Sequence, residues 1–366
     1  MQMRGIRNSI FLIVAILAAV GIVMIYSASA IYAHEKMGDS LYFLKRHLIY
    51  LAIGFMMMLA AMSVNLNDLK KIAKPIIAAS VIMLILVLIP HIGKETAGAR
   101  RWFKFGPVNF QPSEFAKVAM IIYIADLVSR KEGLMRDFRR GYAPPVMVLG
   151  VVVGLVLLEP DLGTAITISV ITILMLYSSG VKVSHIAASF LASLPVLYTL
   201  IFSVPYRRRR ILAFLNPWAD SRGTGFQIIQ SFVALGSGGI FGVGLGQSRQ
   251  KLFYLPASHT DFIFSIIGEE MGFIGTACVV MLFILFVWQG MRIAFQALGS
   301  FERLLSLGIV SLVGLEAVIN IGVTAGALPT KGLPLPFISY GGTGLIFHFM
   351  AIGLLLNVAK DCEACR

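Results

Sequence analysis

Asp261 stands where a polar segment meets a long apolar run, a position from which a carboxylate can act on a substrate at a membrane surface. The segment LPASHT, residues 255–260, has the composition of a loop, and the residues from Phe262 onward have that of a buried helix. A carboxylate at a helix start commonly serves as the N-cap. It can also act as a general base that accepts a proton from a substrate hydroxyl. The residue types alone favour the cap and leave the base open.

An acid and a base at the start of another apolar run, Glu114 and Lys117, form a second candidate site. Pro112 and Ser113 are typical helix-start residues, and Glu114 suits the positive end of the helix dipole. Lys117 follows Glu114 by three residues, so both side chains share one helix face. The pair is explained by a helix start alone, or by binding of a substrate phosphate or a cation. The polar segment before it adds three cationic residues and an aromatic one, Arg100, Arg101, Lys104 and Trp102.

Further ionisable residues lie within apolar runs, where a central charge costs roughly 2.5–3.5 kcal/mol on insertion scales and is a functional candidate. Glu269 and Glu270 lie about two helical turns beyond Asp261, and adjacent residues point about 100° apart, so at most one shares its side. Lys331 lies in the proline- and glycine-rich loop LPTKGLPLPFISYGG, residues 328–342. Three other mid-span polar residues are better explained by helix packing: Glu316, Asn320 and His348.

The composition predicts an all-α polytopic membrane protein that forms a single integral membrane domain over residues 1–366. Of the 366 residues, 58% are hydrophobic and 13% are charged, whereas soluble domains carry about 25% charged residues. The apolar runs are mostly near the roughly 20 residues that cross a bilayer as a helix, and the first lacks the pattern of a cleaved signal peptide. Ten transmembrane helices are expected, at residues 8–28, 47–64, 73–92, 114–129, 144–158, 164–180, 184–204, 262–288, 304–325 and 337–358.

Lys and Arg residues in the short loops predict the orientation of these spans. An even number of spans places both termini on one side, and most short-loop Lys and Arg residues then fall on that side, which makes it cytoplasmic. The segment 205–260, between spans seven and eight, is then a large extracytoplasmic loop that lies along the membrane or folds back into it. Its cluster Arg207–Arg210 can bind lipid phosphates or gather an anionic substrate, and composition does not separate the two.

Several common binding motifs do not occur in the sequence. Gly242, Gly244 and Gly246 are neither preceded by a strand nor followed by a βαβ unit, so they do not form a nucleotide-binding loop. There is no Walker motif, zinc-spaced His/Cys set or nucleic-acid module, and we expect no organic cofactor and no nucleic-acid partner. Cys362 and Cys365 form a C-x-x-C without a second ligand pair, which does not favour a metal or redox site.

Five motifs resemble the SEDS family of shape, elongation, division and sporulation proteins. Two of them, GLGQSRQK and LPTKGLPLPFISYGG, are more similar to the FtsW-like division and sporulation branch than to the rod-shape branch. The resemblance runs from MIYSASA in the first span to the last span. In chain order the motifs are QPSEFAK, NPWADSRGTGFQIIQS, GVGLGQSRQKLFYLP, HTDFIFSIIGEEMGFIG and LPTKGLPLPFISYGG.

The resemblance implies a peptidoglycan glycosyltransferase that polymerises lipid II at the outer face of the cytoplasmic membrane, at the septum during cell division, or in sporulation. It implies as partners a class B penicillin-binding protein, which is the cross-linking transpeptidase, together with other divisome membrane proteins and membrane lipid. The essential aspartate of the family corresponds to Asp261, the expected general base, with undecaprenyl diphosphate as leaving group. The residues expected to bind substrate are Trp102, Glu114 and Lys117, to which we add Arg101 and Lys331.

Two questions stay open at this point. A divalent cation, Mg²⁺ or Mn²⁺, could lie between Asp261 or Glu114 and the diphosphate, by analogy with magnesium at other phosphates. The chain could instead be a lipid II flippase, or a scaffold that recruits a transpeptidase without catalysing a reaction. The pair Ala257–Ser258 differs from the Pro-Glu or Glu-Ala commoner in the family, and the aspartate itself stays in place.

Overall fold

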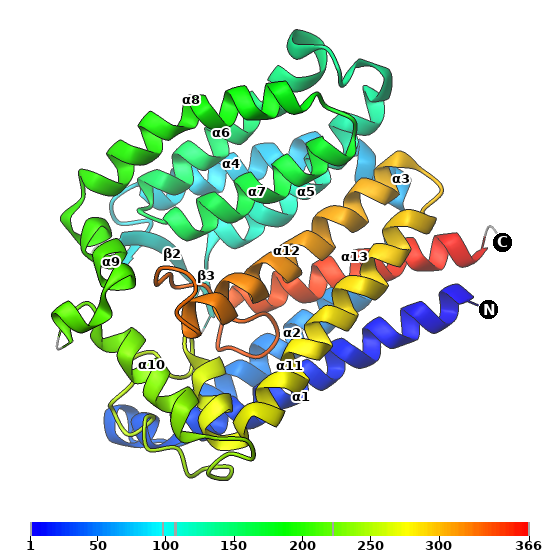
Figure 1. Ribbon diagram of the computed structural model, residues 1–366. Helices are drawn as coiled ribbons and strands as arrows, with labels where there is room; N and C mark the ends of the chain where they lie inside the picture. Colours follow the sequence, from blue (N-terminus) through cyan, green and yellow to red (C-terminus); the bar gives the residue numbers. More distant parts are fainter. Residues whose placement is uncertain (1, 97–98, 106–107, 222, 365–366) are drawn as a thin grey trace.

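The fold is a bundle of long helices with a small β-sheet at one end (Figure 1). The computed structural model describes residues 2–96, 99–105, 108–221 and 223–364. The ten longer helices of this described part are α1 (Gln2–Met37), α2 (Tyr42–Ser63), α4 (Ala73–Leu88), α5 (Pro112–Arg130), α6 (Ala143–Leu158), α7 (Leu162–Ser178), α8 (Val183–Phe202), α11 (Ile263–Gln296), α12 (Ser300–Thr324) and α13 (Thr343–Ala364). The shorter helical elements are α3 (Leu66–Lys71), η1 (Glu132–Leu134), η2 (Phe138–Tyr142), α9 (Pro205–Leu215), η3 (Pro217–Asp220) and α10 (Phe226–Ser237).

The ten predicted spans correspond to the ten longer helices, which confirms a helical multi-pass membrane fold. Among the described residues, seven helices are long and apolar enough to cross a membrane, and α4, α7 and α10 are apolar but shorter. Helix α5 is less apolar because it carries Glu114, Lys117 and Asp126, all of them buried within the bundle. The last helix starts later than expected, since residues 337–342 form an irregular loop with Phe337 at φ 65°. The number of membrane crossings stays a prediction.

The polar segment before α5, predicted as a loop, is a small three-stranded antiparallel sheet in a fold that is otherwise helical. Its strands are β1 (Lys94–Thr96), β2 (Ala99–Phe105) and β3 (Val108–Phe110). In β2, Phe103 is buried and Lys104 is exposed. Alternate buried and exposed side chains are typical of a strand that packs one face on the rest of the protein and turns the other to solvent.

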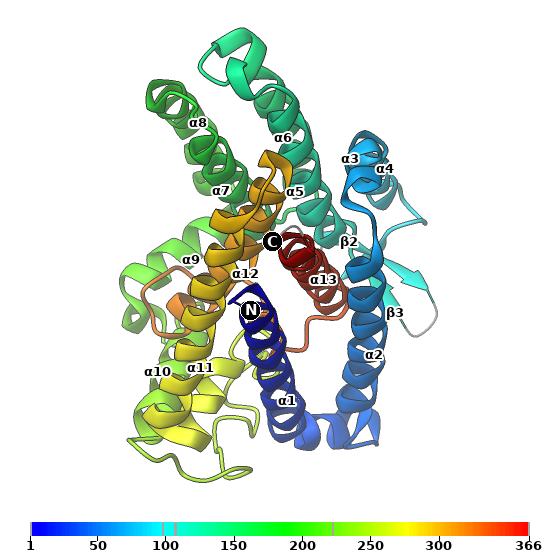
Figure 2. The ribbon, with the colours of Figure 1, turned by 90° about the vertical axis from the view of Figure 1, so that its right-hand side faces the viewer.

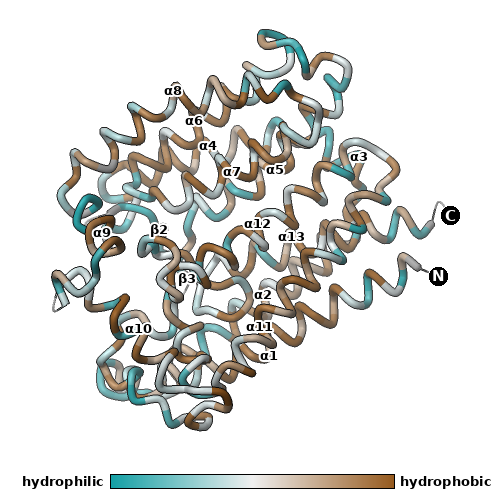
Figure 3. The backbone as a smooth tube through the Cα atoms, in the orientation of Figure 1, coloured by the Kyte–Doolittle hydropathy of each residue, from teal (hydrophilic) through white to brown (hydrophobic). Residues whose placement is uncertain are grey.

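Helix α13 is central and helix α8 is peripheral. In their most apolar 18-residue windows, 78% of α13 is buried and 0% of α8. Figure 2 shows α13 between α12, α1 and α2, and it packs against all three. Hydrophobic residues follow the helices, whereas hydrophilic residues gather in the connecting segments at the ends of the bundle (Figure 3). The polar residues in the centre of the bundle are therefore the ones that require an explanation.

Helix α11 is interrupted at Gly272, whose backbone has φ 67° and ψ −164°. An interruption leaves backbone groups without helical partners, which is costly away from water. The glycine-rich segment 238–246 supplies those partners. The Val243 N–H donates to the Glu269 carbonyl at 2.9 Å, and two further bonds run from α11 N–H groups back to the segment. This part of the long loop therefore folds back onto the membrane helices, as its composition predicts.

The two chain termini lie at the same end of the bundle (Figure 1). Arg7 Nη1 and Glu363 Oε2 form an ion pair at 2.9 Å, which joins the start of α1 to the end of α13. The β-sheet and the start of α13 lie at the opposite end. An even number of membrane crossings is consistent with this arrangement.

Candidate functional site

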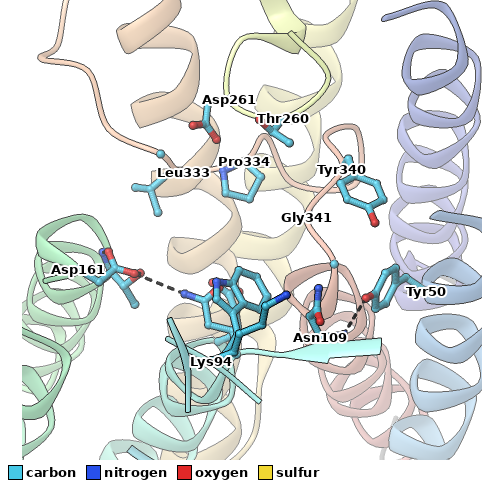
Figure 4. Close-up of a pocket in the computed structure, with 16 residues that line it drawn as sticks. Tyr50, Lys94, Asn109, Asp161, Thr260, Asp261, Leu333, Pro334, Tyr340 and Gly341 are labelled. Atoms are coloured by element: carbon cyan, nitrogen blue, oxygen red, sulfur yellow. Dashed lines mark hydrogen bonds between the residues drawn. The ribbon is translucent and has the colours of Figure 1, made fainter. Parts of the chain in front are cut away.

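A cavity of about 410 Å³ opens at the end of the bundle away from the termini. Gly341 and Gly342, just before α13, line it, whereas the other end of α13 carries Glu363. Figure 4 shows Asp261 and Thr260 across the cavity from Lys94 and Asn109. The described polar and aromatic side chains in its wall are Tyr50, Lys94, Trp102, Asn109, Gln111, Glu114, Asp161, Thr164, Thr260, Asp261 and Tyr340.

Asp261 does not cap helix α11, so the helix-cap interpretation is wrong. The helix begins at Ile263, its N-cap residue is Phe262, and within the described chain no side-chain hydrogen bond caps it. The Asp261 side chain lies in the cavity wall instead (Figure 4). Its backbone carbonyl accepts a hydrogen bond from Asn320 Nδ2 at 2.9 Å, which attaches the residue to α12.

The Asp261 carboxylate is electrostatically suited to accept a proton. Burial raises the pKa of Asp261 from 3.8 to about 6, and the positive charge of Arg210 opposes this rise. A carboxyl group with this pKa is mostly ionised at neutral pH and is a stronger base than an ordinary aspartate. Efficient general bases have pKa values close to the working pH.

The loop before α13 is fastened to the segment that carries Asp261. Ser339 Oγ donates to the Thr260 carbonyl at 2.6 Å. The Tyr340 N–H donates to the His259 carbonyl at 3.0 Å. Two motifs that are far apart in the sequence therefore form one continuous wall of the cavity.

Glu114 and Lys117 form the ion pair that their spacing predicts. Lys117 Nζ lies 2.8 Å from Glu114 Oε2. Helix α5 begins at Pro112, so the helix start places Glu114 at the cavity. Lys117 lies one turn deeper, is 3% exposed and does not belong to the cavity wall. The cavity therefore contains the acid of this pair and not the base.

Two residues interpreted as helix-packing groups extend this pair into the bundle. Lys117 Nζ also contacts Glu316 Oε1 of α12. Glu316 Oε2 lies 2.6 Å from His348 Nε2 of α13. The helix-packing interpretation of Glu316 and His348 is therefore incomplete, because both belong to one ionic network with Glu114.

Of the other predicted substrate-binding residues in the sheet, Trp102 lines the cavity and Arg101 does not. Arg101 donates from Nε to the Glu159 carbonyl and from Nη2 to the Pro160 carbonyl, each at 2.7 Å. These bonds fasten β2 to the connection between α6 and α7. Arg101 thus stands beside the cavity, and its Nε and Nη2 groups are hydrogen-bonded to these two backbone carbonyls.

Lys331 likewise stands beside the cavity without lining it. Burial lowers the pKa of the Lys331 ammonium group, and the nearby Asp161 opposes this change. Lys94 of β1 lines the cavity, although the sequence interpretation did not single it out. Among the described lysines, Lys94 is the one that lines the cavity.

Asp161 is a cavity carboxylate that sequence reasoning missed. It is the N-cap of α7, and its carboxylate accepts bonds from Thr164 N at 3.1 Å and Thr164 Oγ1 at 3.0 Å. It also accepts a long bond from Gln111 Nε2 at 3.4 Å. The sequence signal, an Asp three residues before a Thr at a helix start, predicts a cap and says nothing of a cavity.

Glu269 and Glu270 form a separate polar cluster away from the cavity. Glu270 Oε1 pairs with Lys251 Nζ at 2.7 Å. Glu269 Oε1 accepts the Arg249 N–H at 2.9 Å. Both carboxylates therefore bind the long loop, which supplies the pairing that buried charges require.

The cavity provides carboxylates for a cation but no complete set of protein ligands. The described residues contain no group of three His, Cys, Asp or Glu side chains placed to hold a metal ion. Glu114, Asp161 and Asp261 line the cavity. Magnesium commonly binds through one or two carboxylates together with water and substrate phosphates, so this set fits a cation only when a diphosphate is also present. Of the C-x-x-C pair, Cys362 is buried, and Cys365 lies outside the described residues.

Comparisons of the sequence with known proteins agree over nearly its whole length. The family model of the FtsW, RodA and SpoVE cell cycle proteins matches residues 7–363. A probable peptidoglycan glycosyltransferase FtsW of Geobacter metallireducens is 46% identical over 350 residues, which cover 96% of this chain and 93% of that protein. Stage V sporulation protein E of Bacillus subtilis is 42% identical over 349 residues, which cover 95% of this chain and 94% of that protein.

Solved structures with a similar fold are also those of proteins connected with peptidoglycan synthesis or rod shape. One is a chain from a study of how a peptidoglycan synthase complex coordinates polymerization and crosslinking, with a TM-score of 0.79, 31% identity, and coverage of 96% of this chain and 97% of that chain. Another is the rod shape determining protein RodA of Thermus thermophilus, with a TM-score of 0.71, 29% identity and 96% of each chain covered.

Proposed function

Because the chain belongs to the FtsW, RodA and SpoVE family of cell cycle proteins, the SEDS family, we propose that it is a peptidoglycan glycosyltransferase that polymerises lipid II. The observation that carries this function is Asp261, a carboxylate with a raised pKa in the wall of a cavity of about 410 Å³. Trp102 and Glu114 line the same cavity. A cavity of this kind suits a substrate that combines sugar rings with a charged group.

The proposed reaction transfers a glycosyl group between two lipid-linked sugars. A sugar hydroxyl oxygen forms a bond to the anomeric carbon of the donor, and its proton passes to the Asp261 carboxylate. The bond between that carbon and the diphosphate oxygen breaks, and undecaprenyl diphosphate leaves with the bonding electrons. Since the leaving group is already a stable anion, a general acid is not required.

The anionic diphosphate requires positive charge in a cavity rich in carboxylates. Lys94 lines the cavity, and Arg210 acts electrostatically on Asp261. We assign Lys94, Arg101 and Lys331 to the charge that surrounds the diphosphate, and Trp102 to contact with a sugar ring. A bound Mg²⁺ or Mn²⁺ would add Lewis-acid stabilisation of the diphosphate. Asp261 or Glu114 would hold such an ion.

The proposed orientation places both termini in the cytoplasm and the cavity at the outer face of the cytoplasmic membrane. The ion pair between Arg7 and Glu363 supports this orientation, because it joins the termini at the end away from the cavity. Lys and Arg residues in the short loops support the cytoplasmic side. We propose the division septum as the site of action, and a sporulation role is the alternative.

The proposed partner is a class B penicillin-binding protein that cross-links the new glycan, together with other divisome membrane proteins. Support comes from the structural relative in a peptidoglycan synthase complex. Helix α8, whose most apolar window is 0% buried, supports the proposal because its exposed apolar side chains can contact lipid or a membrane partner.

The function is tested by reconstituting the purified protein in vesicles, with its partner transpeptidase, and supplying labelled lipid II. We expect glycan strands from the wild type, and a rate lower by roughly 10²–10⁴-fold for Asp261→Asn, because a general base contributes about that factor. Asp68→Asn is the control, since the Asp68 side chain on helix α3 is 63% exposed. An Asp261→Asn variant that polymerises at the wild-type rate contradicts the assigned base.

The same vesicles distinguish the alternative functions. Translocation of lipid II that survives Asp261→Asn, without glycan synthesis by the wild type, supports a flippase. A separate experiment in cells tests the scaffold. If cells that carry Asp261→Asn grow normally and the partner transpeptidase still localises, the scaffold function is supported. Chelation with EDTA, followed by addition of Mg²⁺ or Mn²⁺, tests the cation, whose proposed role predicts that activity is lost and then restored.

A further inference from the structure

Tyr50 of α2 brings a phenol hydroxyl group to the wall of the cavity. The residue is otherwise buried, with an exposure of 3%. The ring of Tyr340, which also lines the cavity, lies nearly perpendicular to it, with ring centroids 6.4 Å apart and an angle of 79° between the planes. The packing of the Tyr50 ring therefore limits where its hydroxyl group can point.

The hydrogen bond that Tyr50 makes leaves its own hydroxyl hydrogen free to donate. The Asn109 backbone N–H donates to the Tyr50 hydroxyl oxygen at 3.1 Å. A backbone N–H group cannot accept, so the hydroxyl is the acceptor in this bond and keeps its own hydrogen for another partner. Among the residues that the structure describes, no second bond of this hydroxyl is present. A buried donor without an acceptor is costly, so we expect a molecule in the cavity to accept this hydrogen.

Asn109 of β3 adds an amide side chain to the same part of the cavity wall. Figure 4 shows it next to the hydroxyl end of Tyr50. Within the described ranges, the bonds of Asn109 use its backbone, so the side-chain amide is available to a ligand. This amide has a carbonyl oxygen that accepts. A hydroxyl donor therefore stands beside an amide acceptor, an arrangement that suits a ligand with both a C=O and an N–H group.

Gly342 leaves a small apolar space beside the Tyr50 ring. A Cβ atom at residue 342 would lie 3.9 Å from Tyr50 Cζ and 3.9 Å from Trp102 Cζ3, which is ordinary van der Waals contact with both rings. The backbone of Gly342 has φ 55°, a conformation that favours glycine. No side chain of its own fills the space, and all three residues line the cavity. A methyl group of a ligand can therefore pack against both rings here.

These three features together fit an acetamido group. Its carbonyl oxygen accepts the Tyr50 hydroxyl hydrogen, its N–H donates to the Asn109 side-chain oxygen, and its methyl group packs beside Gly342. A phosphate group offers neither an N–H hydrogen for the Asn109 oxygen nor a methyl group for the apolar space. A sugar hydroxyl group also lacks the methyl group. Both sugars of lipid II carry an acetamido group, so the proposed substrate contains the group that this part of the wall fits.

We propose that Tyr50, Asn109 and Gly342 form an acetamido subsite that binds the acceptor sugar, whose hydroxyl group attacks. Figure 4 shows Asp261 and Tyr50 on different sides of the cavity. The attacking hydroxyl group must lie at Asp261, and in the acceptor sugar it projects from a different part of the ring than the acetamido group. In the donor sugar, the acetamido group is attached next to the reacting carbon. The subsite deepens the proposed glycosyl transfer and rests on it.

Two substrate analogues test the subsite with the reconstituted protein. In the acceptor-sugar analogue of lipid II, a hydroxyl group replaces the acetamido group of the sugar that carries the attacking hydroxyl. In the donor-sugar analogue, the same replacement is made on the sugar that carries the diphosphate. We expect kcat/KM of the wild type to be lower for the acceptor-sugar analogue than for lipid II by roughly tenfold or more, because the analogue leaves buried polar groups of the protein unpaired.

Two variants should reduce this preference for lipid II. Tyr50→Phe removes the donor, and Asn109→Ala removes the acceptor. Each should lower the ratio of kcat/KM between lipid II and the acceptor-sugar analogue by roughly three- to tenfold, the contribution of one hydrogen bond. The ratio for the donor-sugar analogue should stay at its wild-type value.

A purely structural role for Tyr50 predicts a different pattern. Tyr50→Phe also removes the acceptor of the Asn109 N–H, so damage to β3 would slow the reaction of all three lipids equally and leave the preference unchanged. That result, or a change confined to the donor-sugar analogue, overturns the proposal. Asn109→Ala keeps the backbone N–H and its bond to Tyr50, so it decides the question if Tyr50→Phe fails to fold. Tyr142→Phe is the matched control, since Tyr142 is 2% exposed, its hydroxyl group donates to Ser189, and it lies outside the cavity wall.

Binding measurements separate the subsite from the proposed reaction. The affinity of the purified protein for lipid II and for the acceptor-sugar analogue is measured in vesicles without turnover. We expect the wild type to bind lipid II more tightly, and Tyr50→Phe to bind the two lipids with more similar affinities. Equal affinities in the wild type would show that there is no acetamido subsite. A wild type that forms no glycan contradicts the proposed function, whereas a binding preference that Tyr50→Phe reduces still supports the subsite.

Discussion

Gly332 lies directly against the carboxylate of Asp261. A Cβ atom at residue 332 would stand 3.1 Å from Asp261 Oδ2, which is closer than ordinary contact between a carbon and an oxygen atom. The loop before α13 therefore limits where the Asp261 carboxylate can point. A side chain at residue 332 would have to displace the proposed base.

Gly332→Ala should reduce activity without unfolding the protein. We expect the polymerisation rate to fall by roughly tenfold, because displacements of well below 1 Å at a reacting group already slow a reaction. Gly332 is exposed and does not have a positive φ, so stability should change by no more than about 0.5 kcal/mol. Initial rates and melting temperatures measure the two effects.

Gly236→Ala is the matched control for this substitution. Gly236 lies in α10, and a Cβ atom there would meet no described atom within 4 Å. Its rate should equal that of the wild type. Equal rates for Gly332→Ala and Gly236→Ala would show that the close contact with Asp261 has no catalytic consequence.

The polymerisation rate should depend on pH through Asp261. Its pKa is raised from 3.8 to about 6, and a general base works only when ionised. The rate should therefore level off above about pH 7, reach half of this level near pH 6, and fall by about tenfold per pH unit at lower pH. Initial rates across this range, with protein integrity checked at each pH, measure the profile. A rate that falls only near pH 4 would place the working group elsewhere.

Glu159→Gln should leave activity unchanged and remove a pH dependence of stability. The Glu159 carboxylate is fully buried, and burial and the neighbouring Asp161 raise its pKa to about 8, against the charge of Arg101. Between the ordinary glutamate pKa of 4.5 and this raised pKa, the folded protein holds a proton that the unfolded chain has released. Stability should therefore fall as pH rises, by about 1.4 kcal/mol per unit.

The measurement is the melting temperature of wild type and Glu159→Gln at a series of pH values. The variant should lose this slope and become the more stable protein near pH 8. Parallel curves for the two proteins would mean that Glu159 is ionised in the folded state, with a partner that stabilises its charge.

Gly242→Ala should destabilise the protein through the interrupted helix α11. Gly242 has φ 82°, and a Cβ atom there would lie 2.2 Å from the Glu270 carbonyl oxygen. Backbone strain and this clash together should cost about 2 kcal/mol or more. Gly246→Ala is the control, because φ is 79° but no described atom lies within 4 Å of the added Cβ. It should cost only about 1 kcal/mol, and similar melting temperatures for both variants would contradict the importance of the close approach.

The helices could be predicted from the sequence because apolar runs of sufficient length have few other ways to cross a membrane. The sheet before α5 could not, because β1 and β3 have three residues each and are too short to show a period. The apolar–polar alternation of Phe103 and Lys104 is visible in the sequence. These two residues form a strand because they pair with Phe110 and Asn109, and the sequence does not reveal this pairing.

The cavity was predictable only in part. Trp102, Glu114 and Asp261 come together as expected, since each lies at the start or just before the start of a helix or in the segment leading to one. Arg101 turns to backbone carbonyl groups, a choice that depends on the position of a distant helix connection. The contact between Lys117 and Glu316 joins residues 199 positions apart, so no local pattern signals it.

The interruption of α11 has a mechanical consequence for Asp261. Between described residues, four backbone hydrogen bonds join the segment from Gly239 to Gly244 with residues 269–274 of the helix. The chain between these two regions is thus a closed loop, clasped at its base, and Asp261 lies within it. Breaking these four hydrogen bonds would leave backbone N–H and C=O groups unpaired, at a cost of several kcal/mol each where no water reaches them. The base of the loop that carries Asp261 is therefore anchored in the helix bundle, and Asn320 attaches Asp261 itself to α12.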